Sequence, residues 1–96
     1  MIKSKYESVE EKGITFFFKY DKTNVSVLHI YARHRTTIDD ALEVFFNTTA
    51  LWNKQYQRYE NLSHSHGLYW FWRNEQKKEV TVITCFRAAS VFRIEQ

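Results

Sequence analysis

The chain has 96 residues, 44% of them hydrophobic and 26% charged, and its formal net charge is +3 at pH 7. These values suit a single domain spanning residues 1–96 with a modest core, and they exclude an intrinsically disordered chain. No apolar run reaches the roughly 18 residues of a membrane span. The mild positive charge permits contact with nucleic acid or an acidic protein without requiring either.

Aromatic residues are unusually frequent for so short a chain. They make up 18% of the sequence, as eight Phe, six Tyr and three Trp, whereas proline is absent. A small core has difficulty enclosing so many rings. We therefore expect some of them on the surface, where rigid rings bind partners well.

The N-terminal segment, residues 1–12, mixes charges of both signs without a sustained period, and we expect it to be loosely ordered. It contains no apolar stretch typical of a secretory signal. The single cysteine, Cys85, cannot form an internal disulfide, which favours a cytoplasmic protein. Its place in a predicted strand favours a small buried side chain over a nucleophile.

Two strands joined by a hairpin are predicted next. Along residues 14–20, Phe16 and Phe18 alternate with Phe17 and Lys19, which is typical of a strand. The polar residues 21–24 then form a turn, and residues 25–34 alternate again as a second strand.

A single long helix is predicted over residues 37–60. Thr37 and Asp40 have the spacing of a capping box, with Asp in place of the usual Glu. An apolar stripe at spacings of three and four residues predicts one buried helix face. Its members are Ile38, Leu42, Phe45, Thr49, Trp52, Tyr56 and Tyr59. Weak helix formers at residues 47–49 allow a kink or a break there.

The C-terminal third predicts further strands. Alternation over residues 68–73 and 80–87 indicates a third and a fourth strand, and residues 88–94 form a fifth strand or a bent continuation. The order strand, strand, helix, strand, strand predicts an α+β fold. Its sheet is mainly antiparallel, with four or five strands, and one long helix packs on one face.

Alternation also divides the strand residues between two sheet faces. The face toward the helix is expected to carry Ile14, Phe16, Phe18, Leu28, Ile30, Leu68, Trp70, Trp72, Val80, Val82 and Phe86. The opposite face is the candidate binding surface, with Phe17, Lys19, His29, Tyr31, Arg33, Tyr69, Phe71, Arg73 and Arg87, and also Ile83. A slip of one residue would exchange the two faces.

Rings and cations on one sheet face are compatible with several functions. They suit a protein interface or a homodimer, and they also suit single-stranded RNA or DNA, because rings stack on bases and cations meet phosphates. A further chain segment could instead cover the face. Our leading hypothesis is a small non-enzymatic protein of the inhibitor, immunity or accessory type that binds another protein. A nucleic-acid-binding module is the alternative.

Enzymatic and metal-binding readings have less support. His64 and His66 lie on the same side of an extended segment, but a metal site needs three or four ligands, so we expect no metal and no cofactor. A small metal-independent ribonuclease remains as a third hypothesis, with an imidazole as general base and Arg33 as a phosphate clamp. Its candidate residues are His29, Tyr31, Arg33 and His34.

Overall fold

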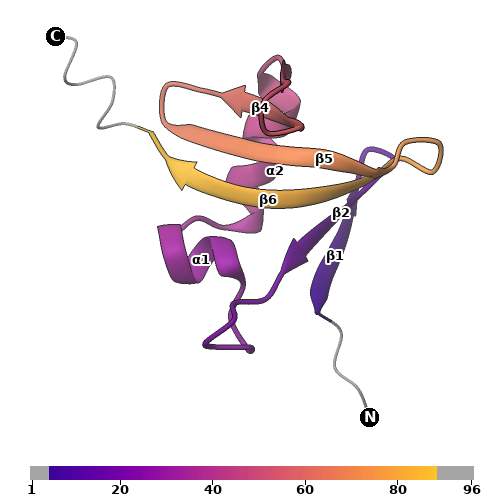
Figure 1. Ribbon diagram of the computed structural model, residues 1–96. Helices are drawn as coiled ribbons and strands as arrows, with labels where there is room; N and C mark the ends of the chain where they lie inside the picture. The colour runs from indigo at the N-terminus through magenta and orange to yellow at the C-terminus, as the bar shows by residue number, and fades with distance from the viewer. Residues whose placement is uncertain (1–4, 89–96) are drawn as a thin grey trace, which may run out of the picture.

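One sheet and two short helices make up residues 5–88, the part of the chain that the computed structural model describes (Figure 1). In chain order the elements are β1 (Tyr6–Glu11), β2 (Ile14–Lys19), α1 (His29–His34), α2 (Ile38–Asn47), β3 (Leu51–Asn53), β4 (Arg58–Leu62), β5 (His66–Asn74) and β6 (Glu79–Arg87). No helix among these residues is long and apolar enough to cross a membrane.

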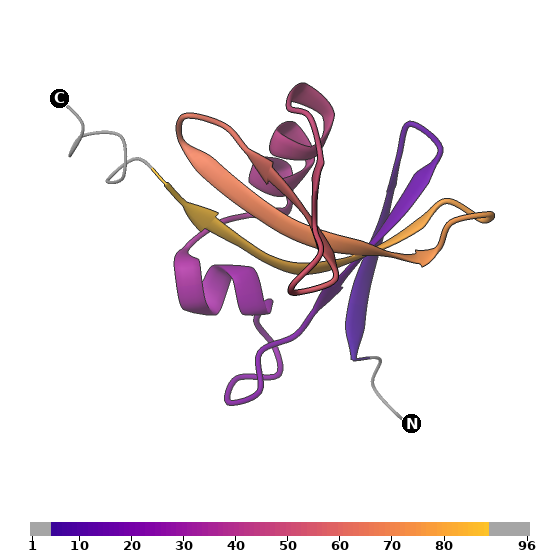
Figure 2. The same cartoon turned by 45° about the horizontal axis from the view of Figure 1, so that its top comes forward.

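The sheet has six strands in the order β1-β2-β6-β5-β4-β3 and is mixed. Four neighbouring pairs are antiparallel, whereas β2 and β6 run parallel, with Phe16 beside Val80 and Phe18 beside Val82. The turn before β2 and the turn before β6 therefore lie at the same end of the sheet, where the Thr15 amide donates to the Lys78 carbonyl (Figures 1 and 2).

The core lies between the sheet and the two helices, which pack on the same face, called here the inner face. It combines residues of β2, β5 and β6 with residues of both helices: Phe16, Phe18, Ile30, Ala41, Val44, Leu68, Trp70, Val80, Val82 and Cys85. Phe45 of α2 joins the layers, because its ring contacts those of Phe16 and Trp70. Burial raises the pKa of the Cys85 thiol to about 11, so this side chain is a buried filler, as expected.

The predicted fold class, a four- or five-stranded antiparallel sheet with one long helix, is wrong in three respects besides the number of strands, which is six. The first is the parallel pair. The second is the segment 25–34, which forms a loop and α1 instead of a strand. The Asp21 carboxylate accepts hydrogen bonds from the amides of Thr23 and Asn24, and the Asn24 side chain accepts from Ser26. These local bonds hold the chain in turns and compete with strand pairing.

The third error concerns the helix over 37–60. Its start is confirmed, because Thr37 and Asp40 form the capping box in both directions. However, α2 ends at Asn47, where residues 47–49 were expected to weaken it. Residues 51–53 and 58–62 then pair as β3 and β4, which places Trp52 and Tyr56 outside any helix and leaves them exposed. The repeat of apolar residues beyond Thr49 therefore has the right spacing by coincidence.

Strands were predicted correctly over 14–20, 68–73 and 80–87, apart from their ends. The N-terminal segment, expected to be loosely ordered, contains β1, and the fifth strand expected at 88–94 falls almost entirely outside the described residues. A β-bulge opposite Tyr69 and Trp70 adds one residue to β6 and reverses its alternation after Val82. As a result Cys85 points inward and Phe86 outward, opposite to the expectation.

A candidate binding surface

The sheet face opposite the helices, the outer face, carries more than half of the predicted binding residues. From β2 and β5 come Phe17, Lys19, Tyr69, Phe71 and Arg73. Strand pairing adds residues that were not predicted as candidates, namely Tyr6, Arg58, Glu60, Thr81 and Phe86. Both helices contribute to the core on the inner face, and α1 also reaches the end of β6, where the ring centre of His34 lies 6.2 Å from that of Phe86 (Figure 1).

Arg73 packs against two rings on the outer face. Its guanidinium carbon lies 4.1 Å from the ring centre of Phe17 and 4.5 Å from that of Tyr6. Its Nε donates to the Thr81 hydroxyl at 2.9 Å. Cation–π contacts of this kind fix the side chain, and they cover ring surface that a nucleic-acid base would otherwise use for stacking.

Arg58 forms a second group of this type nearby. Its guanidinium carbon lies 3.8 Å from the ring centre of Tyr69 and 4.6 Å from that of Tyr56. Its Nε also donates to the Glu60 carboxylate at 2.8 Å, and Asn53 donates to the same oxygen. Burial of Glu60 works to raise its pKa, but these hydrogen bonds outweigh it and the pKa is lowered. Glu60 therefore neutralises Arg58 within the protein.

Exposed apolar side chains gather beside Arg58. The exposed fractions are large for Leu51 (67%), Tyr56 (59%), Leu62 (56%), Trp52 (51%) and Phe71 (39%). Leu62 lies at the other end of β4 from Arg58, opposite Gly67. Most of these residues are on the outer face of β3, β4 and β5 or in the β3–β4 turn, and Trp52 projects from β3 on the other side. Exposed apolar groups around a ring-stacked arginine are typical of the centre of a protein interface.

The remaining predicted binding residues lie elsewhere. His29, Tyr31 and Arg33 belong to α1, on the inner side of the sheet, because the predicted second strand is a helix. Arg87 points toward the helices, where it donates to the Arg35 carbonyl at 3.5 Å, because the bulge reverses the end of β6. Four of the predicted residues are thus separated from the outer face.

The α1 region holds a buried carboxylate, that of Asp21. The Thr23 hydroxyl donates to it at 2.7 Å, and Arg33 donates at 3.1 Å. The Thr23 hydrogen bond and the positive charge of Arg33 lower the Asp21 pKa to about 2, although burial acts in the opposite direction. Arg33 is therefore already paired with a carboxylate and is poorly placed to clamp a phosphate.

Two histidines flank this cluster, His29 and His34, whose ring centres lie 6.2 Å apart. Burial lowers the His29 pKa, and the nearby charge of Lys19 lowers it further. A neutral imidazole of this kind could act as a base. Tyr31, however, is exposed and lies beneath Arg35. The four residues named for a ribonuclease therefore do not converge on one point.

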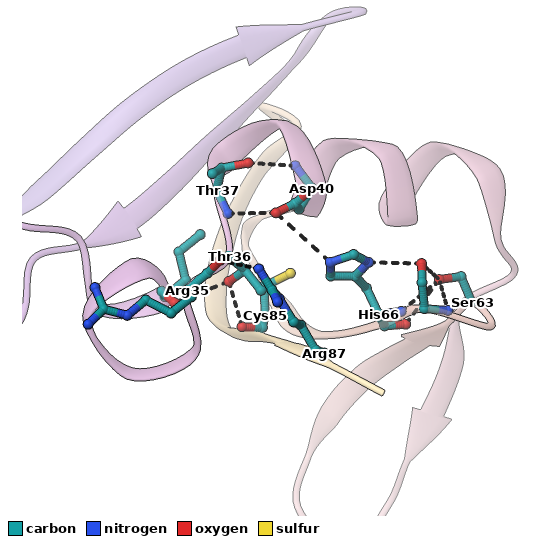
Figure 3. Close-up of polar contacts among 10 residues, drawn as sticks. Arg35, Thr36, Thr37, Asp40, Ser63, His66, Cys85 and Arg87 are labelled. Atoms are coloured by element: carbon teal, nitrogen blue, oxygen red, sulfur yellow. Dashed lines mark hydrogen bonds and ion pairs between the residues drawn. The ribbon is translucent and has the colours of Figure 1, made fainter. Parts of the chain in front are cut away.

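A second polar cluster joins the start of α2 to the start of β5 (Figure 3). The ring of His66 lies between the Ser65 hydroxyl, at 2.9 Å from Nδ1, and the Asp40 carboxylate, at 3.9 Å from Nε2. Asp40 also accepts from the Thr37 amide. Serine, histidine and aspartate here are in the reverse order to a hydrolytic triad, in which the carboxylate contacts Nδ1 and the nucleophile Nε2. The cluster therefore links the N-terminal cap of α2 to the loop between β4 and β5.

The histidine pair at 64 and 66 was considered as a metal site. Within residues 5–88 no three His, Cys, Asp or Glu side chains lie close enough together to hold an ion. His64 is exposed, whereas His66 faces Asp40. The pair therefore does not act as a unit in this structure.

Sequence reasoning missed Arg58 and its partners because residues 51–62 were assigned to a helix. A signal was nevertheless present. The mostly polar residues 53–57, with Tyr56 as the exception, separate Trp52 from residues 58–62, where Arg58 and Glu60 alternate with Tyr59 and Asn61. A polar turn between two short alternating segments is typical of a hairpin.

Comparisons of the chain with models of protein families, with curated proteins and with solved structures find no match.

Proposed function

We propose that this is a non-enzymatic protein of the inhibitor, immunity or accessory type, which binds another protein through its outer sheet face. The observation that supports the proposal is the cluster of exposed apolar residues around Arg58, on the outer face of β3 to β5. A surface this rich in rings and arginine has the composition of interface centres. The unpaired thiol of Cys85 favours action in a reducing compartment such as the cytoplasm.

The cations of the outer face favour protein over nucleic acid as the partner. Arg58 is neutralised by Glu60, and Arg73 already donates to Thr81. A site for single-stranded nucleic acid needs free cations for phosphates and free ring surfaces for bases. Here the guanidinium groups occupy ring surface of Phe17 and Tyr69 instead.

The same features define the chemistry of the partner. It presents an apolar strip that covers Phe71 and Leu51, both of which are exposed. The formal net charge of +3 favours an acidic partner at longer range.

The proposal is tested by titrating a partner, purified after recovery from the native cell, against variants of this protein. We expect Phe71→Ala to weaken binding by about tenfold or more, because it removes an apolar contact at the centre of the surface. Tyr31→Ala is the matched control, since Tyr31 is an exposed ring on α1, away from the outer face. Equal affinity of the Phe71→Ala variant and the wild-type protein would contradict the proposal.

A further inference from the structure

The two edge strands of the sheet differ in how well they are protected against pairing with a further strand. β1 carries Glu7, Glu10 and Glu11 along its length, which discourages another strand from pairing with it. β3 ends the sheet on the other side, and its outward edge pairs with no strand among the described residues. Its three residues, Leu51 to Asn53, include no charge, no proline and no bulge. An uncharged edge of this kind is a template for strand addition.

Trp52, at the centre of β3, has a ring that is fixed by its neighbours and partly exposed. Its ring packs against Tyr59 with 4.8 Å between ring centres, and Tyr59 stacks on the buried Trp70 at 4.6 Å. These contacts fix the ring, yet half of the Trp52 side chain stays exposed. Because the Trp52 ring is already fixed, it loses little conformational entropy when a partner binds. Trp is also enriched among the residues that dominate the energetics of interfaces.

The sequence around Trp52 is complementary to itself. When two copies of residues 50–54 run antiparallel about a twofold axis through Trp52, Trp52 meets Trp52 and Leu51 meets Asn53 of the other copy. Lys54 then lies opposite Ala50, so no like charges face each other along the pair. Aromatic cross-strand pairs stabilise a sheet, whereas like charges directly opposite destabilise it.

We propose that β3 pairs antiparallel with β3 of a second copy of this chain, with the two Trp52 residues facing each other across the twofold axis. The two sheets become one continuous sheet, and both outer faces lie on the same side of it. The inference is independent of the proposed function, because it concerns the edge of the sheet and needs no other protein. Since β3 has only three residues, the dimer is a weak, concentration-dependent one.

Sedimentation velocity over a wide range of protein concentrations tests the proposal. The wild-type protein should shift from one to two chain masses as concentration rises. Trp52→Glu and Trp52→Lys should each weaken self-association by about tenfold or more, because each places like charges on the axis. A mixture of the two variants should associate again, since opposite charges then meet. Tyr31→Glu, on α1, is the control and should associate like the wild-type protein.

A disulfide trap tests the register without altering Trp52. Leu51→Cys and Asn53→Cys proteins, mixed under mild oxidation, should form a cross-linked dimer, because these positions lie opposite each other on the same face. Leu51→Cys mixed with Lys54→Cys should not, since Lys54 lies on the other face and out of register. A wild-type protein that stays monomeric at all concentrations would overturn the proposal. So would a dimer that tolerates both charged variants, or one that cross-links equally well in the two mixtures.

Discussion

Arg58, Arg73 and Asp21 show how single charged residues are used in this protein. Arg58 and Arg73 lie on rings of neighbouring strands, so their aliphatic stems and guanidinium planes cover apolar surface. Asp21 is buried and organises a loop through its hydrogen bonds with Thr23 and Asn24. In each case the charge contributes mainly to local order.

The lowered pKa of Asp21 gives a prediction about acid stability. Because its pKa is about 2 in the folded protein and near 3.9 in an unfolded chain, the ionised form stabilises the fold above the unfolded value. That contribution is lost as pH falls toward 2. We therefore expect Asp21→Asn to lower the free energy of unfolding at pH 7, and the difference from the wild-type protein to shrink on acidification.

Urea denaturation at several pH values between 7 and 2 measures this difference. Glu10→Gln, which removes an exposed carboxylate on β1, is the control and should change stability little at any of these pH values. A destabilisation by Asp21→Asn that stays constant down to pH 2 would show that the ionised carboxylate does not carry the effect.

The end of α2 depends on one buried amide, that of Asn61 in β4. Its Nδ2 donates to the Thr48 carbonyl at 3.3 Å, and its Oδ1 accepts from Trp70 Nε1 at 2.8 Å. The helix terminus and a core tryptophan are thus satisfied by the same side chain. An apolar residue here would leave a buried donor and a buried acceptor unpaired.

Asn61→Ala should lower the free energy of unfolding by about 2–4 kcal/mol, because it orphans the Trp70 indole and opens a small cavity. Asn47→Ala is the matched control. Asn47 is exposed and bonds only the Glu43 carbonyl within the described residues, so its loss should cost less than about 1 kcal/mol. Thermal or urea denaturation distinguishes the two. Similar losses for both variants would contradict the role given to Asn61.

The strands β2, β5 and β6 could be predicted from the sequence because their alternation is driven by burial on one face. That is why Phe17, Tyr69, Phe71 and Arg73 were correctly placed together. The ends of the helices could not be predicted from such a local pattern. α1 depends on the Asp21 loop, and the end of α2 depends on Asn61, which lies 14 positions after Asn47. Contacts over such a distance leave no local period in the sequence.

The bulge in β6 also could not be predicted from the sequence. One added residue exchanges the faces of every later side chain, and nothing in residues 80–87 departs from regular alternation. Arg87 was therefore assigned to the wrong face. The edge strands β1 and β3 were missed for another reason, since a charged edge and a three-residue edge both lack the alternation that burial produces.

For the molecule as a whole, the formal net charge of +3 predicts only weak attraction to nucleic acid. Single-stranded oligonucleotides should bind weakly, and Arg73→Gln should change that binding little, because Arg73 is engaged with Phe17 and Thr81. Fluorescence anisotropy at low and high salt measures this. A tight complex that weakens steeply with salt, and further in Arg73→Gln, would favour the nucleic-acid alternative.

The parallel pairing of β2 with β6 has a consequence for how the chain folds. β2 is complete after 19 residues, but its neighbour on the core side starts at Glu79. During synthesis Phe16 and Phe18 of the β1–β2 hairpin therefore lack their neighbour on that side until residues 79–87 have emerged. Closing so large a loop is slow relative to local hairpins. The chain is thus most exposed to aggregation and to chaperone binding before β6 joins the sheet.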